Sequence, residues 1–309
     1  MSTTVLVVGG SGFIGRHLIE KLLNEGLNVK LLDIHKPNWV SQKVEFLKGS
    51  FIELKEEHNV FFKDVNVIYH LASTTTPHSA EKNYSYDIET NLIGTIKLLD
   101  LAVKNNVKKF IFSSSGGTVY GDKHSGDISE KMISEPVCSY GVVKLAIEKY
   151  LSIYNNKHGM QTCSIRISNP YGIYQDPSKK QGVIPIFINK LINEEVIEIW
   201  GDGNIFRDFI YIDDLIEALY KCLMVEYQNE VINIGSSVAS SINDVVELIF
   251  KSSNKKTKVV YKKSRGYDVN HSCLNIDKAK EVLSWKPTVN LEDGIIKLTN
   301  YYIKSEGVK

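Results

Sequence analysis

The segment Val5-Leu6-Val7-Val8-Gly9-Gly10-Ser11-Gly12-Phe13-Ile14-Gly15 decides the fold of this 309-residue chain. Its first four residues are all apolar, which is typical of a strand covered on both faces of a parallel sheet. The glycines have the spacing Gly9-x-x-Gly12-x-x-Gly15, and an apolar pattern with helical spacing follows them. Gly9 permits a tight turn, Gly12 lets a ligand approach the backbone, and Gly15 lets the helix pack on the strand. The segment predicts a strand, a turn and a helix whose free N–H groups favour a diphosphate.

An acidic residue ends the second predicted strand. Asp33 follows Val29–Leu32, about the ~20 residues downstream of the glycines at which a dinucleotide-binding acid is expected. A carboxylate there accepts hydrogen bonds from the adenosine ribose hydroxyls and repels a 2′-phosphate. No arginine follows in Ile34-His35-Lys36, so NAD(H) is favoured as the cofactor, although Lys36 leaves NADP(H) possible.

Strands and helices alternate through the first half of the chain. Such βαβ units predict an α/β fold with right-handed crossovers, a doubly wound parallel sheet of the Rossmann type. The pattern of the last third of the chain predicts a smaller C-terminal α+β lobe that caps the ligand-binding edge of the sheet. We expect domains at 1–168 and 169–309, with parts of about 205–235 returning to the main domain, and Phe209–Ile212 and Val231–Ile234 as candidates for its sheet. The expected strands are Val5–Val8, Val29–Leu32, Val44–Leu47, Val67–Tyr69, Phe110–Phe112 and Thr162–Ile167, and the expected helices are Phe13–Leu23, Thr90–Val103, Ser139–Tyr154, Ile184–Asn193, Asp214–Met224, Ile242–Phe250 and Leu291–Tyr302.

Composition excludes several classes of function. Lys and Arg number 37 and Asp and Glu 36, so the net charge of +1 argues against nucleic acid as a partner. No apolar run reaches the ~18 residues of a membrane span, and the first residues do not resemble a signal peptide. The four cysteines form no CxxC pair, and the histidines have no ligand spacing, so we expect no metal site and a reduced, cytoplasmic protein.

Tyr140-Gly141-Val142-Val143-Lys144 is the candidate acid–base pair. The i, i+4 spacing places both side chains on one helical face. A phenol has a free pKa of about 10, and lowering it by ~3 units requires about 4 kcal/mol. One ammonium at ~4 Å supplies about that much at an effective dielectric constant of ~20. Lys144 is therefore expected to make Tyr140 acidic enough to move a proton near pH 7.

Hydroxyl groups cluster at the end of the fifth predicted strand, which runs into Ser113-Ser114-Ser115-Gly116-Gly117-Thr118-Val119-Tyr120-Gly121. The carboxyl end of a central strand is where doubly wound sheets bind ligands. A hydroxyl there can hydrogen-bond the reacting oxygen and stabilise a developing alkoxide.

Taken together, these motifs resemble the extended short-chain dehydrogenases, in particular the nucleotide-sugar epimerase/dehydratase/reductase group. The matching stretches cover nearly the whole chain: Gly9–Gly15, Asp33, His70-Leu71-Ala72, Asn91, Ser113–Gly121, Tyr140–Lys144, Arg166–Gly172, Gly201-Asp202-Gly203, Arg207–Asp214 and Trp285-Lys286-Pro287. The resemblance implies that Tyr140 gives or takes the proton, that Lys144 binds the nicotinamide ribose, and that a strand-end serine binds the hexose oxygen. It also implies cofactor contacts from Phe13, Ile14, Leu71, Ala72, Asn91 and Ser113.

The resemblance also implies the substrate and the assembly. A nucleoside-diphosphate sugar would be bound by Asn169, Arg207 and Arg265, because its two phosphates need fixed cations. Asp213 and Asp214 are expected to cap a helix, and His70 to be structural. Relatives often pair through the helices at Thr90–Val103 and Ser139–Tyr154, so a homodimer is expected.

Two departures from the family pattern bear on the reaction. Many relatives read Ser-Ser-Ser-Ala-Thr-Val-Tyr-Gly, so Gly116-Gly117 lengthens this segment and leaves the serine register open. We favour Ser115, with Ser114 and Thr118 as alternatives. Gly49-Ser50 stands where relatives usually have Gly-Asp, which predicts a looser hold on adenine. Gly116-Gly117 also lacks the acidic residues that dehydratases carry at this place.

The leading prediction is reduction of a nucleotide-linked 4-keto-6-deoxyhexose such as dTDP-4-dehydro-6-deoxyglucose, and the alternative is a UDP-hexose 4-epimerase that retains NAD. Either enzyme would supply precursors of surface polysaccharides such as O-antigen.

Overall fold

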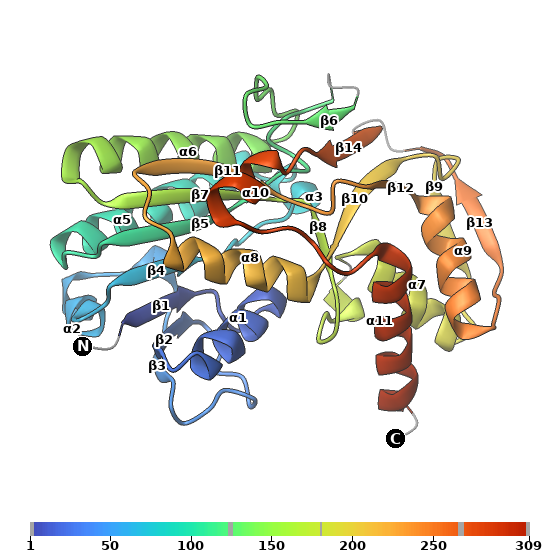
Figure 1. Ribbon diagram of the computed structural model, residues 1–309, viewed down its shortest axis with the longest axis horizontal. Helices are drawn as coiled ribbons and strands as arrows, with labels where there is room; N and C mark the ends of the chain where they lie inside the picture. Colours follow the sequence, from blue (N-terminus) through green and yellow to red (C-terminus); the bar gives the residue numbers. More distant parts are fainter. Residues whose placement is uncertain (1–2, 123–125, 180, 265–268, 307–309) are drawn as a thin grey trace.

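Seven parallel strands form the main sheet of the computed structural model, which describes residues 3–122, 126–179, 181–264 and 269–306. Their spatial order is β11-β7-β5-β4-β1-β2-β3 (Figure 1). The order reverses between β1 and β4, so the carboxyl ends of these two strands flank the crevice that a doubly wound sheet uses for ligands. The strands are β1 (Thr4–Val8), β2 (Asn28–Asp33), β3 (Glu45–Lys48), β4 (Val67–His70), β5 (Lys109–Ser115), β7 (Gln161–Ile167) and β11 (Asn229–Ile234).

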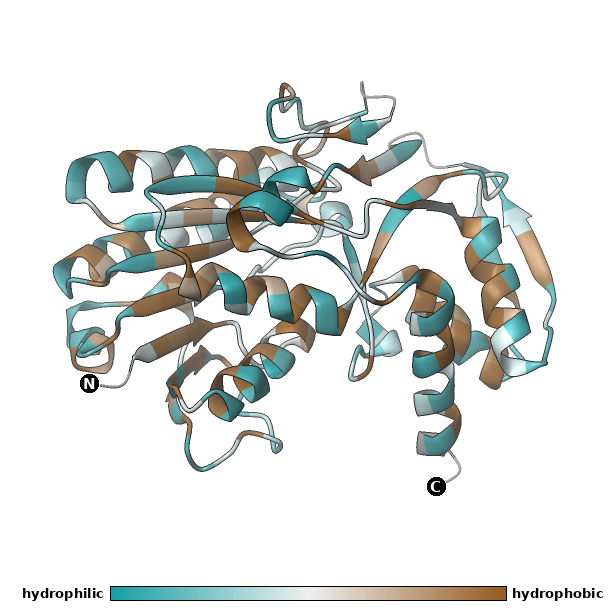
Figure 2. Cartoon of the chain, in the orientation of Figure 1, coloured by the Kyte–Doolittle hydropathy of each residue, from teal (hydrophilic) through white to brown (hydrophobic). Residues whose placement is uncertain are grey.

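Helices cover both faces of this sheet, which confirms the α/β Rossmann prediction. Alternate residues of β1 enter two different cores: Val5 and Val7 pack with the helices of one face, and Leu6 and Val8 with those of the other. Figure 2 shows the apolar strands between helices of mixed polarity. The first face carries α1 (Phe13–Asn24) and α8 (Ile212–Met224), and the second carries α2 (Asn59–Phe62), α5 (Gly94–Lys104) and α6 (Ser139–His158).

Short elements connect the second face to the crevice. The helix expected at Thr90–Val103 is divided, because a π-helical segment, η3 (Ile88–Ile93), precedes α5. The other short helical elements of this region are η1 (Phe51–Glu53), η2 (Glu56–His58), α3 (Pro77–Ala80) and α4 (Tyr84–Asp87).

The second lobe is built on smaller sheets. One has the order β12-β10-β14-β6, with β8 beside β10, and the other pairs β13 with β9. The expectation for Phe209–Ile212 was wrong: these residues lie in β10 and at the start of α8, and β10 pairs within the smaller sheet, whereas β11 joins the main sheet beside β7. The strands are β6 (Asp127–Ile128), β8 (Asn169–Tyr171), β9 (Ile197–Trp200), β10 (Phe206–Tyr211), β12 (Ala239–Ser241), β13 (Val259–Lys262) and β14 (His271–Leu274), and the helices are η4 (Pro177–Lys179), α7 (Val183–Ile192), α9 (Ile242–Ser253), α10 (Asp277–Leu283) and α11 (Leu291–Glu306).

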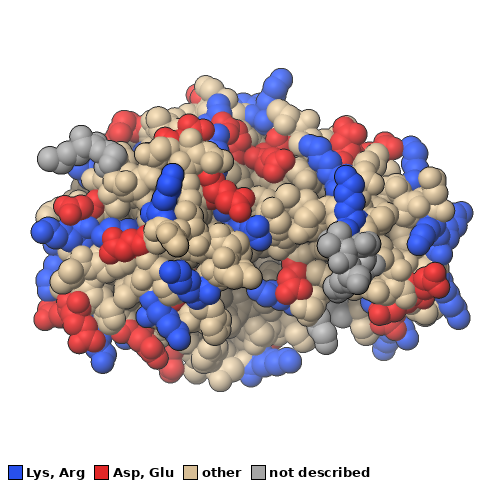
Figure 3. Space-filling view, turned by 90° about the horizontal axis from the view of Figure 1, so that it is seen from below, with Lys and Arg blue, Asp and Glu red and all other residues tan. Residues whose placement is uncertain are grey.

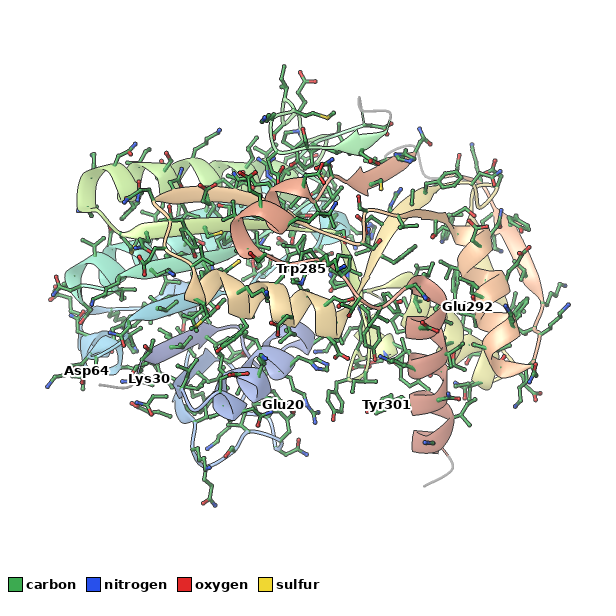
Figure 4. All side chains as sticks on the ribbon, in the orientation of Figure 1. Glu20, Lys30, Asp64, Trp285, Glu292 and Tyr301 are labelled. Carbon is green, nitrogen blue, oxygen red and sulfur yellow. The ribbon has the colours of Figure 1, made fainter. Side chains whose placement is uncertain are left out.

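Side-chain contacts tie the second lobe together. Trp285, labelled in Figure 4, donates its indole N–H to the backbone oxygen of Asp214 at 3.0 Å. The capping role expected for Asp213 and Asp214 was wrong, since Tyr211 occupies the N-cap position of α8. Asp214 instead accepts hydrogen bonds from Thr288 and Val289 and fixes the segment before α11. Glu292, at the start of α11, forms an ion pair with Lys251 of α9 at 2.6 Å (Figure 4).

Surface charge agrees with the composition. Basic and acidic side chains are interspersed over the face in Figure 3, with no basic stripe across it. Within the described ranges, no helix has the length and apolar character needed to cross a membrane.

Candidate active site

The glycine turn lies between β1 and α1, at the carboxyl edge of the main sheet. Gly9 has φ +80°, and a Cβ on it would lie 2.6 Å from the backbone of Ala72. A Cβ on Gly15 would lie 2.4 Å from the Cα of Gly10. The fold itself therefore requires these two glycines.

Gly12 differs from the other two. A Cβ there would meet only the Gly9 carbonyl, at 3.5 Å, which is ordinary contact. The chain does not need this glycine for its own packing, but a ligand lying on the backbone would. Gly12 is also the N-cap of α1, with no side-chain cap and no acid in the first turn. This surface fits the diphosphate of a dinucleotide.

Asp33 lies beside this turn. Its carboxylate accepts hydrogen bonds from the backbone N–H of Ser11 at 3.0 Å and from that of His35 at 3.4 Å. The Ser11 hydroxyl donates to the His35 carbonyl at 2.7 Å. The end of β2 is thus fastened to the glycine turn, where the ribose of a bound dinucleotide is expected.

The loop after β4 forms the other wall of the crevice. The N–H groups of Leu71 and Ala72 both donate to the carbonyl of Val8, at 2.9 and 3.1 Å. Asn91, from η3, accepts from Thr74 N–H through Oδ1 at 2.9 Å and is 5% exposed. Its amide is therefore used to position this loop. His70 is buried at the end of β4, where its Nε2 contacts Thr95 Oγ1 at 2.9 Å, as expected of a structural residue.

Tyr140 and Lys144 lie together in the first turns of α6. The Lys144 ammonium is 5.4 Å from the centre of the Tyr140 ring. Its Nζ donates to the carbonyl of Ser113, at the carboxyl end of β5, at 2.8 Å. The one-face prediction is confirmed, and the pair faces the strand end that carries the serines.

The expected electrostatics differ from those in the protein itself. Burial raises the pKa of Tyr140 above its usual 10, the nearby Asp87 carboxylate and Cys138 thiol raise it further, and the neighbouring Ser73 side chain opposes the shift. Burial also lowers the pKa of Lys144 to about 7. The nicotinamide, whose positive charge was expected to add to that of Lys144, is not part of this balance, so burial is the largest influence on the pKa of the phenol.

The three serines of β5 have separate environments. Ser113 is buried and its hydroxyl donates to the carbonyl of His70 at 3.1 Å. Ser114 donates to the buried carboxylate of Glu148 at 2.5 Å, so it is committed to the interior. Ser115 is partly exposed, and its hydroxyl has no hydrogen-bond partner in the described part of the chain. Thr118 Oγ1 is buried and also lacks a partner among those residues.

The candidate substrate residues lie on β8 and β10. Asn169 donates from its amide to the carbonyl of Asp208 at 3.0 Å, which links the two strands. Arg207 is half-buried on β10 and donates to the carbonyl of Phe206 at 2.8 Å. Arg265 lies outside the described residues.

Three buried acids were not singled out from the sequence. Asp87 accepts from Thr75, Asn91 and Ser139. Glu148 forms a buried ion pair with Arg166 at 2.6 Å. Asp208 accepts from the backbone of Ser236, Ser237 and Leu274, and burial raises its pKa. Glu148 follows Lys144 by four residues, a spacing that the sequence analysis did not use.

Several named proteins are similar to this chain over nearly its whole length. A dTDP-4-dehydro-6-deoxyglucose reductase of Escherichia coli is 37% identical over 95% of this chain and 96% of its own length. A putative UDP-glucose 4-epimerase of Methanocaldococcus jannaschii is 35% identical over 96% and 97%. The crystal structure of a Thermotoga maritima UDP-glucose 4-epimerase with UDP-glucose superposes with a TM-score of 0.94 at 33% identity, covering 98% of this chain and 100% of that one.

A match to a family model shows which protein family the chain belongs to. The model of the NAD dependent epimerase/dehydratase family matches residues 5–235, which span the glycine turn, the β5 serines and Tyr140/Lys144. The family resemblance and the expectation of NAD as cofactor are confirmed at this level. The chain belongs to the NAD-dependent epimerase/dehydratase family, whose relatives here are nucleotide-sugar 4-epimerases and a 4-reductase.

Proposed function

We propose that this enzyme reduces the 4-keto group of a nucleoside-diphosphate 4-keto-6-deoxyhexose, with Tyr140 as the proton donor. The observation that carries this proposal is the placement of Tyr140 and Lys144 at the carboxyl end of β5, the strand that ends at Ser115, fixed by the 2.8 Å bond from Lys144 to Ser113. That place is one strand away from the crevice beside the glycine turn.

The chain's own residues would manage the proton and the oxygen. The Tyr140 phenol gives its proton to the sugar O4 as C4 becomes tetrahedral, and solvent then returns a proton to the phenolate. The hydroxyls of Ser115 and Thr118, which have no hydrogen-bond partner among the described residues, are available to bind that oxygen and stabilise its charge. Lys144 holds the ribose hydroxyls of the cofactor and stabilises the phenolate.

The reduced nicotinamide, when bound, supplies the hydride. Its dinucleotide would be held by the backbone of Gly9, Gly12, Phe13, Ile14 and Gly15, by Asp33 at the ribose, and by Leu71, Ala72 and Ser113 along the crevice. Asn91 would act here by positioning the loop after β4. The carboxylate of Asp33 favours NAD(H), and Lys36 leaves use of NADP(H) open.

Reductase chemistry is supported by two observations. Ser50, which stands where many relatives have an aspartate, accepts the N–H of Ile52 at 3.4 Å and caps η1. It offers no charge to adenine, which suits a cofactor that leaves after every turnover. The Escherichia coli reductase is also similar over nearly the whole chain.

A second candidate is epimerisation at C4 of a UDP-hexose with NAD retained. The high structural similarity to the Thermotoga maritima epimerase favours it. The same residues would serve, because an epimerase first removes and then returns a hydride at C4 of the sugar.

An absorbance assay separates the two candidates. The protein is mixed with NADH or NADPH and dTDP-4-dehydro-6-deoxyglucose, and the reductase is expected to consume the reduced cofactor stoichiometrically at 340 nm. Interconversion of UDP-glucose and UDP-galactose without added cofactor, with no consumption of reduced cofactor, would overturn the reductase assignment in favour of the epimerase.

The substrate's diphosphate is proposed to lie against Asn169 and Arg207, with Arg265 as a further cation. Arg207 is placed on β10, beside the strand that carries Asn169. Planar guanidinium groups suit phosphate oxygens because they donate two parallel hydrogen bonds.

A cytoplasmic homodimer is the proposed assembly. Apolar side chains are exposed on one side of η3 and α6, among them Ile88, Ile93, Val142, Tyr150 and Ile153. These elements lie against each other. A second copy meeting the same surface would bury this patch by two-fold symmetry.

A further inference from the structure

Asp87 is a buried acid beside the catalytic pair. It ends α4, and its side chain is completely shielded from solvent. Thr75 Oγ1 and Asn91 Nδ2 donate to its Oδ1 at 2.7 and 2.8 Å, and Ser139 Oγ donates to Oδ2 at 2.7 Å. All three partners carry donors directed at its oxygens, an arrangement that suits a carboxylate, which accepts through both oxygens.

The charge of Asp87 is not paired. Among the residues that the structure describes, no Lys, Arg or His nitrogen forms an ion pair with it. Glu148, the other buried acid near Lys144, is neutralised by Arg166 at 2.6 Å. An unpaired buried carboxylate is costly to keep, so its location next to an ammonium and a phenol calls for a functional explanation.

We propose that Asp87 is the positioning residue and counter-charge of the catalytic pair: it fixes the start of α6 against the loop after β4, and its negative charge sets the pH range in which Tyr140 and Lys144 work. The proposal rests on the function proposed above, for either the reductase or the epimerase, because both use the same pair.

The hydrogen bonds of Asp87 join three segments around Tyr140. Ser139 immediately precedes Tyr140 in the first turn of α6. Thr75 belongs to the loop that follows β4, and Asn91 both donates to Asp87 and receives the N–H of Thr74. One carboxylate therefore determines where the Tyr140 helix begins relative to the loop that packs on the glycine turn.

Among the groups that face Tyr140 and Lys144, Asp87 is the one that acts on the pKa of both. Tyr140 is faced by Asp87 and Cys138, and both raise its pKa. Lys144 is faced by Asp87 from α4 and by Glu148 from its own helix, and both raise its pKa against the effect of burial. His70 of β4 also lies near Lys144, but its pKa is lowered to about 3, so it is neutral. Glu81 binds the backbone N–H of Ser139 and acts on Cys138.

The sign of the effect follows directly. A negative charge favours the protonated form of both groups, so its removal makes Tyr140 and Lys144 stronger acids. If Tyr140 must lose a proton and Lys144 must keep one in the oxidative direction, each of the two groups sets one limb of the pH profile. Removing the charge moves both limbs of the profile to lower pH.

The test compares Asp87→Asn with Ser139→Ala. Asp87→Asn keeps the size of the side chain and removes its charge, and both limbs of the kcat/KM profile are expected to move down by about 1 pH unit. Ser139→Ala removes one hydrogen bond and keeps the charge, so its limbs are expected to stay in place although its rate falls. If Asp87→Asn does not fold, Asp87→Ser, which leaves room for water, carries the same prediction.

A spectroscopic readout makes the result independent of turnover. Tyrosinate absorbance at 295 nm is titrated in each protein and in its Tyr140→Phe counterpart, and the difference reports Tyr140 alone. The midpoint is expected to fall in Asp87→Asn and not in Ser139→Ala. Unchanged limbs and midpoint in a folded Asp87→Asn or Asp87→Ser protein would overturn the proposal. A lower midpoint in a protein that turns over no nucleotide sugar would refute the proposed function and leave this inference standing.

Discussion

At the residue scale, neighbouring hydroxyls of one strand have opposite tasks. Side chains alternate along β5, so Ser114 points into the core and meets Glu148, while Ser113 and Ser115 point the other way. The alternation leaves Ser115, at the strand end, as the serine whose hydroxyl is available to a ligand.

Alanine substitutions of the two serines should therefore have different effects. Ser115→Ala is expected to lower kcat/KM by about 10²-fold, because one donor to the developing alkoxide is lost, with little change in melting temperature. Ser114→Ala is expected to lower the free energy of unfolding by about 1.5–3 kcal/mol, because a buried hydrogen bond to a charged group is lost. Steady-state kinetics and urea unfolding on both variants check this. If Ser114→Ala instead lowers kcat/KM and Ser115→Ala lowers the free energy of unfolding, Ser114 is the serine that binds the reacting sugar oxygen.

The sequence predicts the positions of the candidate catalytic residues better than it predicts their pKa values. Tyr140, Lys144 and the glycine turn could be found because helical spacing and glycine spacing are local properties. The direction of the Tyr140 pKa shift could not, because it depends on burial and then on Asp87, which is 53 residues away in the chain and meets Tyr140 only after folding.

At the element scale, a buried ion pair fastens α6 to the sheet. Glu148 of α6 receives Arg166 of β7 through Nε at 3.0 Å and Nη2 at 2.6 Å. The Arg166 guanidinium also lies over the Tyr120 ring, 4.6 Å from its centre. Since Tyr140 and Lys144 precede Glu148 on the same helix, this pair fixes their height above β5.

Replacing one partner of the Glu148–Arg166 ion pair should lower the free energy of unfolding more than the pair itself contributes. Glu148→Gln and Arg166→Met are each expected to lower the free energy of unfolding by about 3–5 kcal/mol, because the remaining charge is left buried and alone. The double variant is expected to lose less than the sum of the two. Chemical unfolding of all four proteins measures the coupling, and additive losses would show that the two side chains act independently.

Strand order illustrates what the sequence could not settle at this scale. The sequence suggested Val231–Ile234 and Phe209–Ile212 as strands of the main sheet, and both segments are mostly apolar. Only β11 joins it, because β10 is held in the second lobe by β8, β12 and β14. These partner strands are short and come from distant parts of the chain, so no local sequence pattern predicts that they pair with β10.

At the scale of the whole molecule, the exposed apolar patch on η3 and α6 includes part of the helix that carries Tyr140 and Lys144. Ile153→Glu is expected to convert a dimer of about twice 34.9 kDa into monomers, because a carboxylate would be buried in an apolar interface. Ile303→Glu, on the exposed side of α11, is the matched control and should leave the mass unchanged. Sedimentation equilibrium measures both. A wild-type protein that is monomeric at micromolar concentration would contradict the dimer.

The central claim is that Tyr140 delivers the proton while hydride crosses to C4 of the sugar, a step that the reductase and the second half of an epimerase reaction share. It is tested most directly by single-turnover mixing of the NADH-loaded protein with a 4-keto nucleotide sugar, followed at 340 nm. We expect Tyr140→Phe to slow the loss of NADH absorbance by about 10²–10⁴-fold. Tyr220→Phe, which removes a surface phenol hydrogen-bonded to Glu25, should not slow it. An equal decay rate in wild-type and Tyr140→Phe proteins would contradict it.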